Sequence, residues 1–434
     1  MKRAVDERLR SWKSAARRKP LIVRGARQVG KTWSIDQFGR AEFRNVVTID
    51  FEKRPLLKPL FTGDLSPAAL VEQLELATGQ GIRPGETLLF LDEIQACPRA
   101  VTALRYFHEE LPSLHVVAAG SLLDFALAEV SVPVGRVSYL EMHPLTFWEY
   151  LQAIGNEPAA AALAREPRSL APPIHDMLMN ALKRFLFVGG MPECVAVAAG
   201  GGTLRDVFAV QDDLLKAYRD DFAKYAGRSD RTCLDAVMIH AARHVGEQLK
   251  YTTLDTQHSG QTNRKAFDLL CLARLLHKIP SATPAGLPLG ASANEKRFKA
   301  VFVDVGLMQR LCGLPVDREM QHRDLLDIYR GKLAEQFVGQ ELLVAQEREL
   351  FYWAREARGS SAEVDYLIVR DGRIHPVEVK AGTGGQLRSL HRVLADYPGC
   401  GDGWVLSGGP SGRRPEQRIE FIPLYFAGTV ATRS

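Results

Sequence analysis

The 434-residue sequence lacks the features that mark membrane and secreted proteins. Its apolar runs, such as Leu88–Leu91, are far shorter than the roughly 20 residues that a membrane-spanning helix needs. Its first residues are charged and contain no apolar signal region. Its six cysteines are widely scattered and form no Cys-x-x-Cys pair, as expected of reduced core residues. We therefore expect a soluble, cytoplasmic protein without a membrane partner.

The sequence also lacks a strong excess of charge of either sign. It has 56 Lys and Arg against 51 Asp and Glu, a formal net charge of +5. Such a weakly basic balance permits a nucleic-acid partner but does not indicate one. The length suggests about three domains, with enough chain to bury their cores.

The most specific motif lies near the N-terminus. An apolar strand, Leu21–Val23, leads into Gly25, and Gly30-Lys31-Thr32 follows after four residues, which is the spacing of a phosphate-binding loop. The glycines permit a tight loop with inward-pointing amides, and the helix predicted after it adds its positive end. Lys31 is expected to reach the β- and γ-phosphates of a nucleotide and Thr32 to ligate Mg²⁺. The residues predicted to bind the nucleotide are Gly25, Ala26, Arg27, Gln28, Val29, Gly30, Lys31 and Thr32.

Acidic residues follow a second, fully apolar strand. Thr87–Leu91 is typical of the middle of a parallel sheet, and strands alternate with helices from residue 20 to about 150, which predicts a doubly wound α/β sheet. Asp92 and Glu93 would lie at the carboxyl edge, where such sheets bind ligands. We expect Asp92 to hold Mg²⁺ through water and Glu93 to activate the attacking water. The alternative is a solvated loop pair.

Ser121 follows the next predicted strand, His115–Ala119. At that position its hydroxyl would sense the γ-phosphate or orient the water. The alternative, an ordinary Gly-Ser loop, stays open.

An Ala- and Pro-rich stretch, 153–176, predicts a domain boundary, and residues 177–315 have mostly helical patterns. A short helix at Tyr251–Thr256, a turn and a helix at Thr262–His277 precede an extended pair, Leu276–Ser281 and Phe298–Val303. This is the order of elements in a winged helix.

Arg264 and Lys265 would then begin the recognition helix. Many such modules contact only protein, so nucleic acid and protein both remain candidate partners.

A second chemical constellation lies near the C-terminus. Asp371-Gly372 between alternating strands predicts a hairpin, and counting back from this turn places Asp365 opposite Glu378, with Lys380 on the same face. Facing carboxylates repel unless a cation lies between them, so the pair predicts a Mg²⁺ site. Lys380 would act on the attacking water or the phosphate. The alternative is a solvent-facing polar edge.

These motifs together resemble prokaryotic AAA-type ATPases with a helical, winged-helix-like middle region and a C-terminal domain like restriction endonucleases. The stretches that carry the resemblance are Arg24–Thr32, Phe90–Gln95, Gly120–Leu123, Gly135-Arg136, Pro144–Tyr150, Gly189–Glu193, Glu363–Asp365 and Val377–Lys380.

The resemblance implies an AAA-type P-loop domain over residues 1–152, a winged-helix-like domain over 177–315 and a small α/β nuclease-like domain over 331–434. It implies Asp92 and Glu93 as the Walker B pair and Glu335, on a preceding helix, as a further metal ligand. Arg136 resembles an arginine that contacts the γ-phosphate, within the same chain or from a neighbour.

The function predicted is that of a Mg²⁺-dependent ATPase that uses ATP to move its other domains, acting on DNA or RNA with a metal-dependent nuclease-like end, in a homo-oligomer. The alternatives are an ATP-gated interaction switch with a silent nuclease-like scaffold and a winged-helix DNA-binding regulator.

Overall fold

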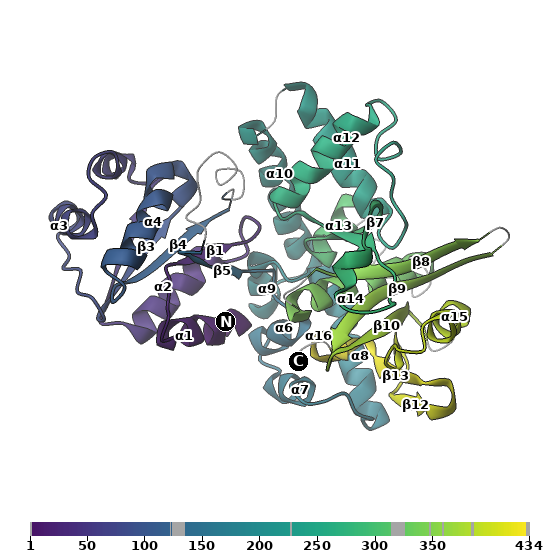
Figure 1. Ribbon diagram of the computed structural model, residues 1–434. Coiled ribbons are helices and arrows are strands. Elements are labelled where there is room, and N and C mark those ends of the chain that lie inside the picture. Colours follow the sequence, from purple (N-terminus) through teal and green to yellow (C-terminus); the bar gives the residue numbers. More distant parts are fainter. Residues whose placement is uncertain are drawn as a thin grey trace. The chain divides into compact units, whose positions relative to one another are not determined.

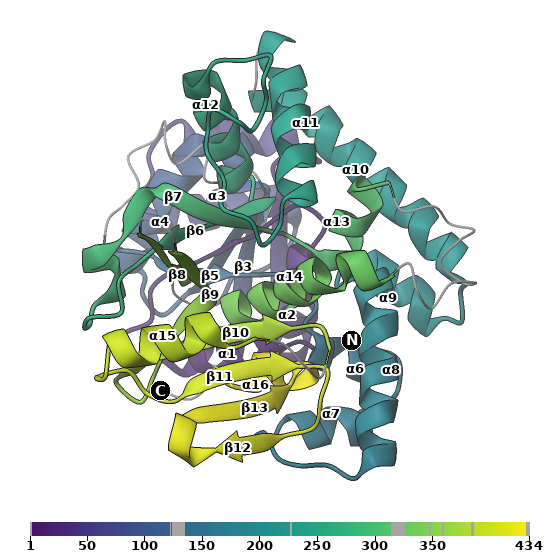
Figure 2. The same cartoon turned by 90° about the vertical axis from the view of Figure 1, so that its right-hand side faces the viewer.

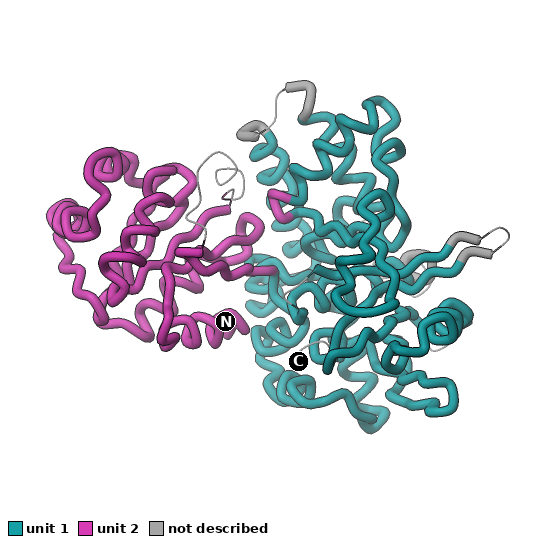
Figure 3. Tube along the Cα trace, viewed as in Figure 1, with its two compact units in different colours: residues 1, 144–271, 275–434 teal, residues 2–143, 272–274 magenta. Residues whose placement is uncertain are grey.

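The computed structural model describes residues 2–121, 123, 135–225, 228–313, 326–346, 349–357, 360–382 and 386–430. The chain divides into two compact units (Figure 3). Unit 2 contains Lys2–His143 and Leu272–Arg274, and unit 1 contains Met1, Pro144–Cys271 and Leu275–Ser434. The segments predicted as the second and third domains therefore lie in one compact unit.

Unit 2 is built on a five-stranded sheet in the order β2-β3-β4-β1-β5 (Figure 1). Every neighbouring pair is parallel, which confirms the predicted parallel α/β sheet. β4 separates β3 from β1, so the two strands that carry the nucleotide motifs are not neighbours. The strands are β1 (Leu21–Arg24), β2 (Asn45–Asp50), β3 (Thr87–Asp92), β4 (His115–Gly120) and β5 (Ser138–Glu141).

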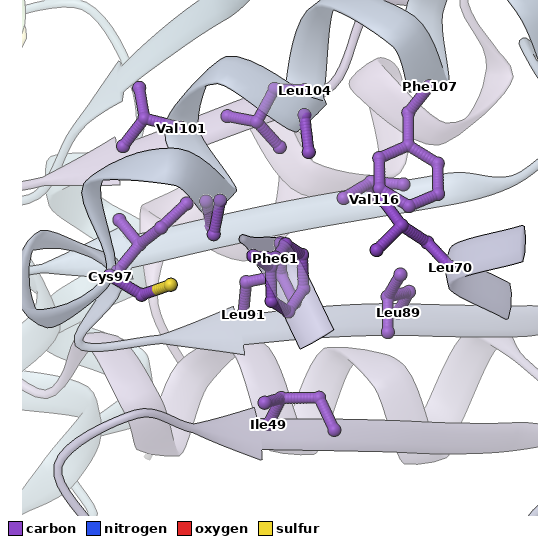
Figure 4. Packing of buried hydrophobic residues seen from close by; sticks show 14 of the residues in the cluster. Ile49, Phe61, Leu70, Leu89, Leu91, Cys97, Val101, Leu104, Phe107 and Val116 are labelled. Carbon is purple, nitrogen blue, oxygen red and sulfur yellow. The ribbon is translucent and has the colours of Figure 1, made fainter. Parts of the chain in front are cut away.

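The side chains of β3 and its neighbouring strands are apolar on both faces of this sheet, so helices cover both faces. On one face, Leu89 and Leu91 of β3 pack with Leu104 and Phe107 of α4 and Leu70 of α3 (Figure 4). On the other face α2 approaches β2 and β3 closely. The helical elements of unit 2 are α1 (Ala4–Ser14), α2 (Lys31–Glu42), η1 (Pro55–Phe61), α3 (Pro67–Thr78), η2 (Ile94–Ala96) and α4 (Pro98–Glu110).

A glycine permits the close approach of α2. A Cβ atom on Gly39 would lie 2.5 Å from a methyl group of Val46 and 2.9 Å from one of Leu88. The C-terminal half of α2, a helix that begins at Lys31, is thereby held against β2 and β3.

Unit 1 joins a helical part to an eight-stranded sheet with the order β12-β13-β11-β10-β9-β8-β6-β7 (Figure 2). Its strands are β6 (Leu276–Ser281), β7 (Asn294–Phe302), β8 (Phe351–Ala357), β9 (Ser360–Arg370), β10 (Arg373–Lys380), β11 (Gly403–Ser407), β12 (Gly412–Arg414) and β13 (Ile419–Pro423). Its helices are α6 (Phe147–Ala153), α7 (Glu157–Leu163), α8 (Pro172–Val188), α9 (Pro192–Ala199), α10 (Leu204–Tyr225), α11 (Arg228–Arg243), α12 (Gly260–Leu272), α13 (Val305–Leu311), α14 (Leu326–Gln346), α15 (Arg388–Asp396) and α16 (Ala427–Val430). Short 3₁₀ turns are η3 (Leu289–Ser292), η4 (Pro415–Gln417) and η5 (Leu424–Phe426). Among the described residues, no helix is both long and apolar enough to cross a membrane.

The predicted winged helix differs from the structure in three ways. Residues 251–256 form turns rather than a helix. α12 ends at Leu272, before the predicted end, and Arg274 then takes a left-handed conformation with φ 61°. The hairpin β6–β7 forms as predicted, but Ser281 of β6 pairs with Tyr352 of β8, so the hairpin extends the C-terminal sheet. It is therefore not a separate wing.

The predicted hairpin at Asp371-Gly372 is confirmed. Both turn residues have positive φ, 50° and 71°, and Val369 pairs with Ile374. The strand pairs run from Arg373 with Arg370 to Val377 with Tyr366, so the ladder ends one residue before Glu378, and the pairing of Asp365 with Glu378 stays a prediction. The alternative of a solvent-facing polar edge does not hold for Glu378, because its side chain is buried and α14 and α15 both pack on β9 and β10.

Candidate functional site

The loop after β1 has the backbone of a tight anion-binding turn. Gly25 and Gly30 have positive φ values of 155° and 91°, and Gln28 is also left-handed, with φ 64°. A Cβ atom on Gly25 would lie 2.1 Å from the carbonyl oxygen of Met142, the residue after β5. Only glycine fits there, so the first glycine of the motif is required by contact as well as by conformation.

Lys31 lies inside this loop. Its side chain is buried, and its ammonium donates to the carbonyl oxygens of Gly25, at 2.9 Å, and Ala26, at 2.8 Å. Burial lowers the pKa of Lys31 to about 8, although the charges of Glu93 and Asp92 oppose the change. The charged ammonium is thus poorly solvated, which favours an anion such as a phosphate as its partner.

Thr32 and Asp92 meet at the start of α2. The Thr32 hydroxyl donates to Asp92 Oδ2 at 2.8 Å. This contact forms although β4 separates β3, which ends at Asp92, from β1, which leads into the loop before Thr32. Burial raises the pKa of Asp92 to about 6, and the charges of Glu93 and Asp50 add to this effect. A hydroxyl and a carboxylate in contact are the pair that holds Mg²⁺ in phosphate-loop enzymes, so these residues fit that ion.

Glu93 is held in a fixed position beside Asp92. Its backbone is left-handed, with φ 48°, and its amide donates to Asp92 Oδ1 at 3.0 Å. The side-chain amide of Gln95 donates to Glu93 Oε2 at 2.5 Å. Gln95 in turn lies against Gly120 at the end of β4, where a Cβ atom would be 2.1 Å from Gln95 Oε1. Gln95 was not predicted as a site residue; its position two residues after Glu93 was the available signal in the sequence.

The other two predicted nucleotide residues lie at opposite ends of the strands. Ser121 is buried and directly follows β4, which places it at the carboxyl edge with the loop and Asp92. Arg136 precedes β5, whose first residue pairs with Leu21, the first residue of β1, and it forms a 2.7 Å ion pair with Glu109. The structure therefore does not bring Arg136 to the loop of its own chain.

In unit 1, the predicted metal ligands lie around a lysine. Lys299 of β7 is buried, and its ammonium lies 2.8 Å from Glu335 Oε1 and 3.5 Å from Asp365 Oδ1. Asp365 Oδ2 accepts a hydrogen bond from the Val379 amide at 2.7 Å, and Lys380 donates to Glu378 Oε1 at 2.6 Å. Sequence reasoning missed Lys299 because it belongs to the hairpin that was predicted as a wing.

The acidic groups of this cluster are poorly solvated. Burial raises the pKa of Glu335 to about 8 and that of Glu378 to about 7, and the charge of Asp365 adds to both shifts. Burial alone would lower the pKa of Lys299, but Glu335, Asp365 and Glu363 raise it well above its usual value. Lys299 is therefore charged at neutral pH.

A different group has the closest metal-ligand geometry among the described residues. Ligand atoms of Cys233, Asp255 and His258 lie within 4.8 Å of one another, whereas Glu335, Asp365 and Glu378 form no such group. His258 Nδ1 is 2.5 Å from Asp255 Oδ2, and the Cys233 thiol donates to Asn263 Oδ1 at 3.4 Å. A contact within the turn before α12 thus accounts for Asp255 and His258, and a contact between α11 and α12 accounts for Cys233.

Comparison with protein families finds a match for the first part of the chain. Residues 17–151 match the family model of an AAA domain, and the parallel sheet and the glycine-rich loop lie within these residues. Residues 179–318 and 330–426 match the models of two domains of unknown function, DUF8612 and DUF4143. No curated protein matches the chain.

Several solved structures are similar in fold. The Walker-type ATPase PABY2304 of Pyrococcus abyssi is 13% identical, with 71% of this chain and 95% of that chain covered and a TM-score of 0.46. The RuvB Holliday junction branch migration motor of Thermotoga maritima is 19% identical, with coverage of 64% and 89% and a TM-score of 0.30. The Orc1 protein of Aeropyrum pernix, solved in complex with DNA, is 12% identical, with coverage of 71% and 90% and a TM-score of 0.30.

Proposed function

We propose that this chain is a Mg²⁺-dependent ATP hydrolase whose centre is the loop Gly25–Thr32 with Asp92 and Glu93. The observation that carries the proposal is the 2.8 Å contact between the Thr32 hydroxyl and Asp92, next to the buried ammonium of Lys31. A lysine, a hydroxyl and a carboxylate around one glycine-rich loop are the parts that phosphoryl-transfer sites share.

Each residue has a distinct task in this proposal. The loop amides and Lys31 bind the β- and γ-phosphates, and Lys31 gives up its loop carbonyls for them. Thr32 and Asp92 hold Mg²⁺, which neutralises charge on the phosphates. Glu93, fixed by Gln95, orients the attacking water and takes its proton. Ser121 lies at the same edge and supplies a hydroxyl to the γ-phosphate or the water.

Nucleotide binding and phosphate release by single variants test the proposal. Lys31→Ala should abolish ATP binding because the phosphates lose their main positive partner, whereas Lys53→Ala, an exposed lysine, should not. Glu93→Gln should bind ATP and release phosphate about 10²-fold more slowly, as expected when a general base is lost. Wild-type ATP affinity in folded Lys31→Ala would refute the assignment.

We further propose that α12 contacts DNA or RNA. Arg264 and Lys265 lie exposed in its first turns. Arg264 makes a long 3.6 Å ion pair with Asp268, and its guanidinium lies 5.8 Å from the centre of the Tyr251 ring. Replacing both by alanine should weaken nucleic-acid binding and reduce the salt slope by about one unit per lost phosphate contact. Binding curves that superpose on wild type at every salt concentration would exclude this helix.

For the C-terminal part, the contacts of Lys299 favour the interaction switch over the nuclease. ATP binding would then gate a partner contact, and the nuclease-like domain would not cut. The test is incubation of the full chain with Mg²⁺, Mn²⁺, ATP and a panel of DNA and RNA, beside Asp365→Asn. Cleavage that Asp365→Asn abolishes would establish the nuclease instead.

A further inference from the structure

Lys299 lies where two separate elements, α14 and β9, direct three carboxylates at one point. Its ammonium is 2.8 Å from Glu335 of α14, and 2.5 Å from Glu363 and 3.5 Å from Asp365, both of β9. Only 2% of the side chain is exposed, and the ring of Tyr352 lies 5.3 Å from the ammonium. Oxygens that converge in this way are the usual surroundings of a bound hard cation.

The predicted metal ligands are already engaged by the chain itself. Glu335 Oε1 and one oxygen of Asp365 face Lys299, and the other Asp365 oxygen accepts the Val379 amide. Glu378 Oε1 accepts from Lys380. Glu378 Oε2 is buried without a hydrogen-bond partner among the described residues. Glu335 is hydrogen-bonded to Lys299 through Oε1, and its Oε2 also has no hydrogen-bond partner among the described residues. Two uncommitted oxygens on separate residues do not form a chelate, because Mg²⁺ and Ca²⁺ take at least six ligands. The side chains as placed do not fit a divalent ion.

The charges explain why a lysine is needed. Four carboxylates, Glu335, Glu363, Asp365 and Glu378, gather in a largely buried region, and burying carboxylates without a counter-charge is strongly unfavourable. Lys299 and Lys380 supply two positive charges. Removal of Lys299 would leave the carboxylates of α14 and β9 with no counter-ion from β7.

We propose that Lys299 is a tethered cation that replaces a divalent ion in this cluster, so that the cluster locks the β6–β7 hairpin to α14 and β9 and is closed to metal. The backbone supports the same lock, since Gln336 of α14 both accepts from the Phe302 amide, at 2.9 Å, and donates to the Phe302 carbonyl, at 2.7 Å. The site is thus an internal ion-pair junction.

The test is a titration of the full, nucleotide-free chain with Mn²⁺ and Ca²⁺, in which calorimetry measures metal binding and thermal melting measures stability. Without nucleotide, the result does not depend on the proposed ATP hydrolysis. Any metal binding by the wild type should be unchanged in Asp365→Asn. Lys299→Met should melt at a lower temperature and gain metal binding at least about tenfold tighter than wild type, because four carboxylates then lack their internal cation. The double variant Lys299→Met with Asp365→Asn should lose this gain.

Two matched variants separate charge from packing. Lys299→Arg keeps a cation and should gain no metal binding. Lys278→Met, on the neighbouring strand β6, removes a lysine that pairs with Glu295 at the surface and should also gain none.

Wild-type Mn²⁺ binding that Asp365→Asn abolishes would overturn the proposal, and so would a folded Lys299→Met without any metal response. If Lys299→Met does not fold, wild type against Asp365→Asn still decides, because any difference in their metal binding contradicts a closed site.

Discussion

Gln95 couples two strand ends of unit 2 through one side chain. Its amide holds Glu93 at 2.5 Å, and its other end lies against Gly120, directly before Ser121. A change at the carboxyl end of β4 would therefore reach Glu93 through Gln95. We interpret Gln95 as a positioning residue, since it acts through Glu93.

Gln95→Ala should lower kcat about tenfold and leave KM for ATP unchanged, because Glu93 would lose its orientation while the phosphate loop stays intact. Steady-state phosphate release measures both constants. Gln73→Ala, an exposed glutamine of α3, is the control. If KM for ATP worsens by as large a factor as kcat, Gln95 supports the phosphate loop instead.

The raised pKa of Asp92, about 6, predicts opposite effects of acid on activity and on stability. Below pH 6 Asp92 binds a proton and loses affinity for Mg²⁺, so kcat/KM for Mg-ATP should fall about tenfold per pH unit. Between about pH 6 and 4 the folded state holds more protons than the unfolded state, so this group should raise stability as the pH falls.

The control for this pH prediction is Asp92→Asn, which cannot titrate. The change in melting temperature between pH 7 and pH 5 should therefore be less favourable in the variant than in wild type. Parallel pH dependences in the two proteins would contradict the role of Asp92 burial.

At the level of elements, the phosphate loop depends on its close approach to the backbone after β5. Gly25→Ala should destabilise unit 2 by about 1–3 kcal/mol and abolish ATP binding, because the new methyl group would overlap the Met142 carbonyl. Gly63→Ala is the matched control, since a Cβ atom there meets nothing within 4 Å. Melting curves and nucleotide titrations check both effects; wild-type ATP affinity in Gly25→Ala would show that the loop can shift at little cost.

Contacts in unit 1 explain two of the sequence motifs that carry the resemblance. In Gly189-Gly190, a Cβ atom on the first residue would lie 2.2 Å from Asp304 Oδ1, and the second donates its amide to Asp304 Oδ2 at 2.6 Å. In Pro144–Tyr150, Thr146 and Glu149 form a capping box at the start of α6. Both motifs are structural parts of unit 1.

Local sequence patterns predicted the turns and loops that depend on nearby residues. They failed where contacts between residues far apart in the sequence decide how an element packs. The glycine and lysine spacing of the loop and the Asp371-Gly372 turn predicted backbone that the structure confirms. The β6–β7 hairpin was also predicted, but its pairing with β8 depends on residues some 70 positions away, which no local pattern contains. Separations of 36 and 66 positions likewise concealed Lys299 as the partner of Glu335 and Asp365. The roles of individual site residues stay predictions.

At the level of the whole molecule, the position of Arg136 concerns the assembly of this chain with further copies of itself. It lies at the amino ends of the strands and pairs with Glu109, so a contact with a γ-phosphate would have to be made to a neighbouring chain. Arg136→Ala should then bind ATP but turn over slowly. Mixing it with Lys31→Ala should restore turnover, because each variant supplies what the other lacks. Arg105→Ala, which removes another partner of Glu109, is the control. Unchanged turnover in Arg136→Ala would exclude the role.

The shared sheet of unit 1 also constrains how this chain can change over evolution. Lys299 lies in the segment that matches one family model, residues 179–318, and Glu335 and Asp365 lie in the segment that matches another, residues 330–426. A recombination event between the two segments would separate a buried lysine from its acids and β7 from the rest of its sheet. Each half would then carry an unpaired charge. We therefore expect these two segments to be inherited together, and a replacement of either one to succeed only with a partner that has kept the matching charges.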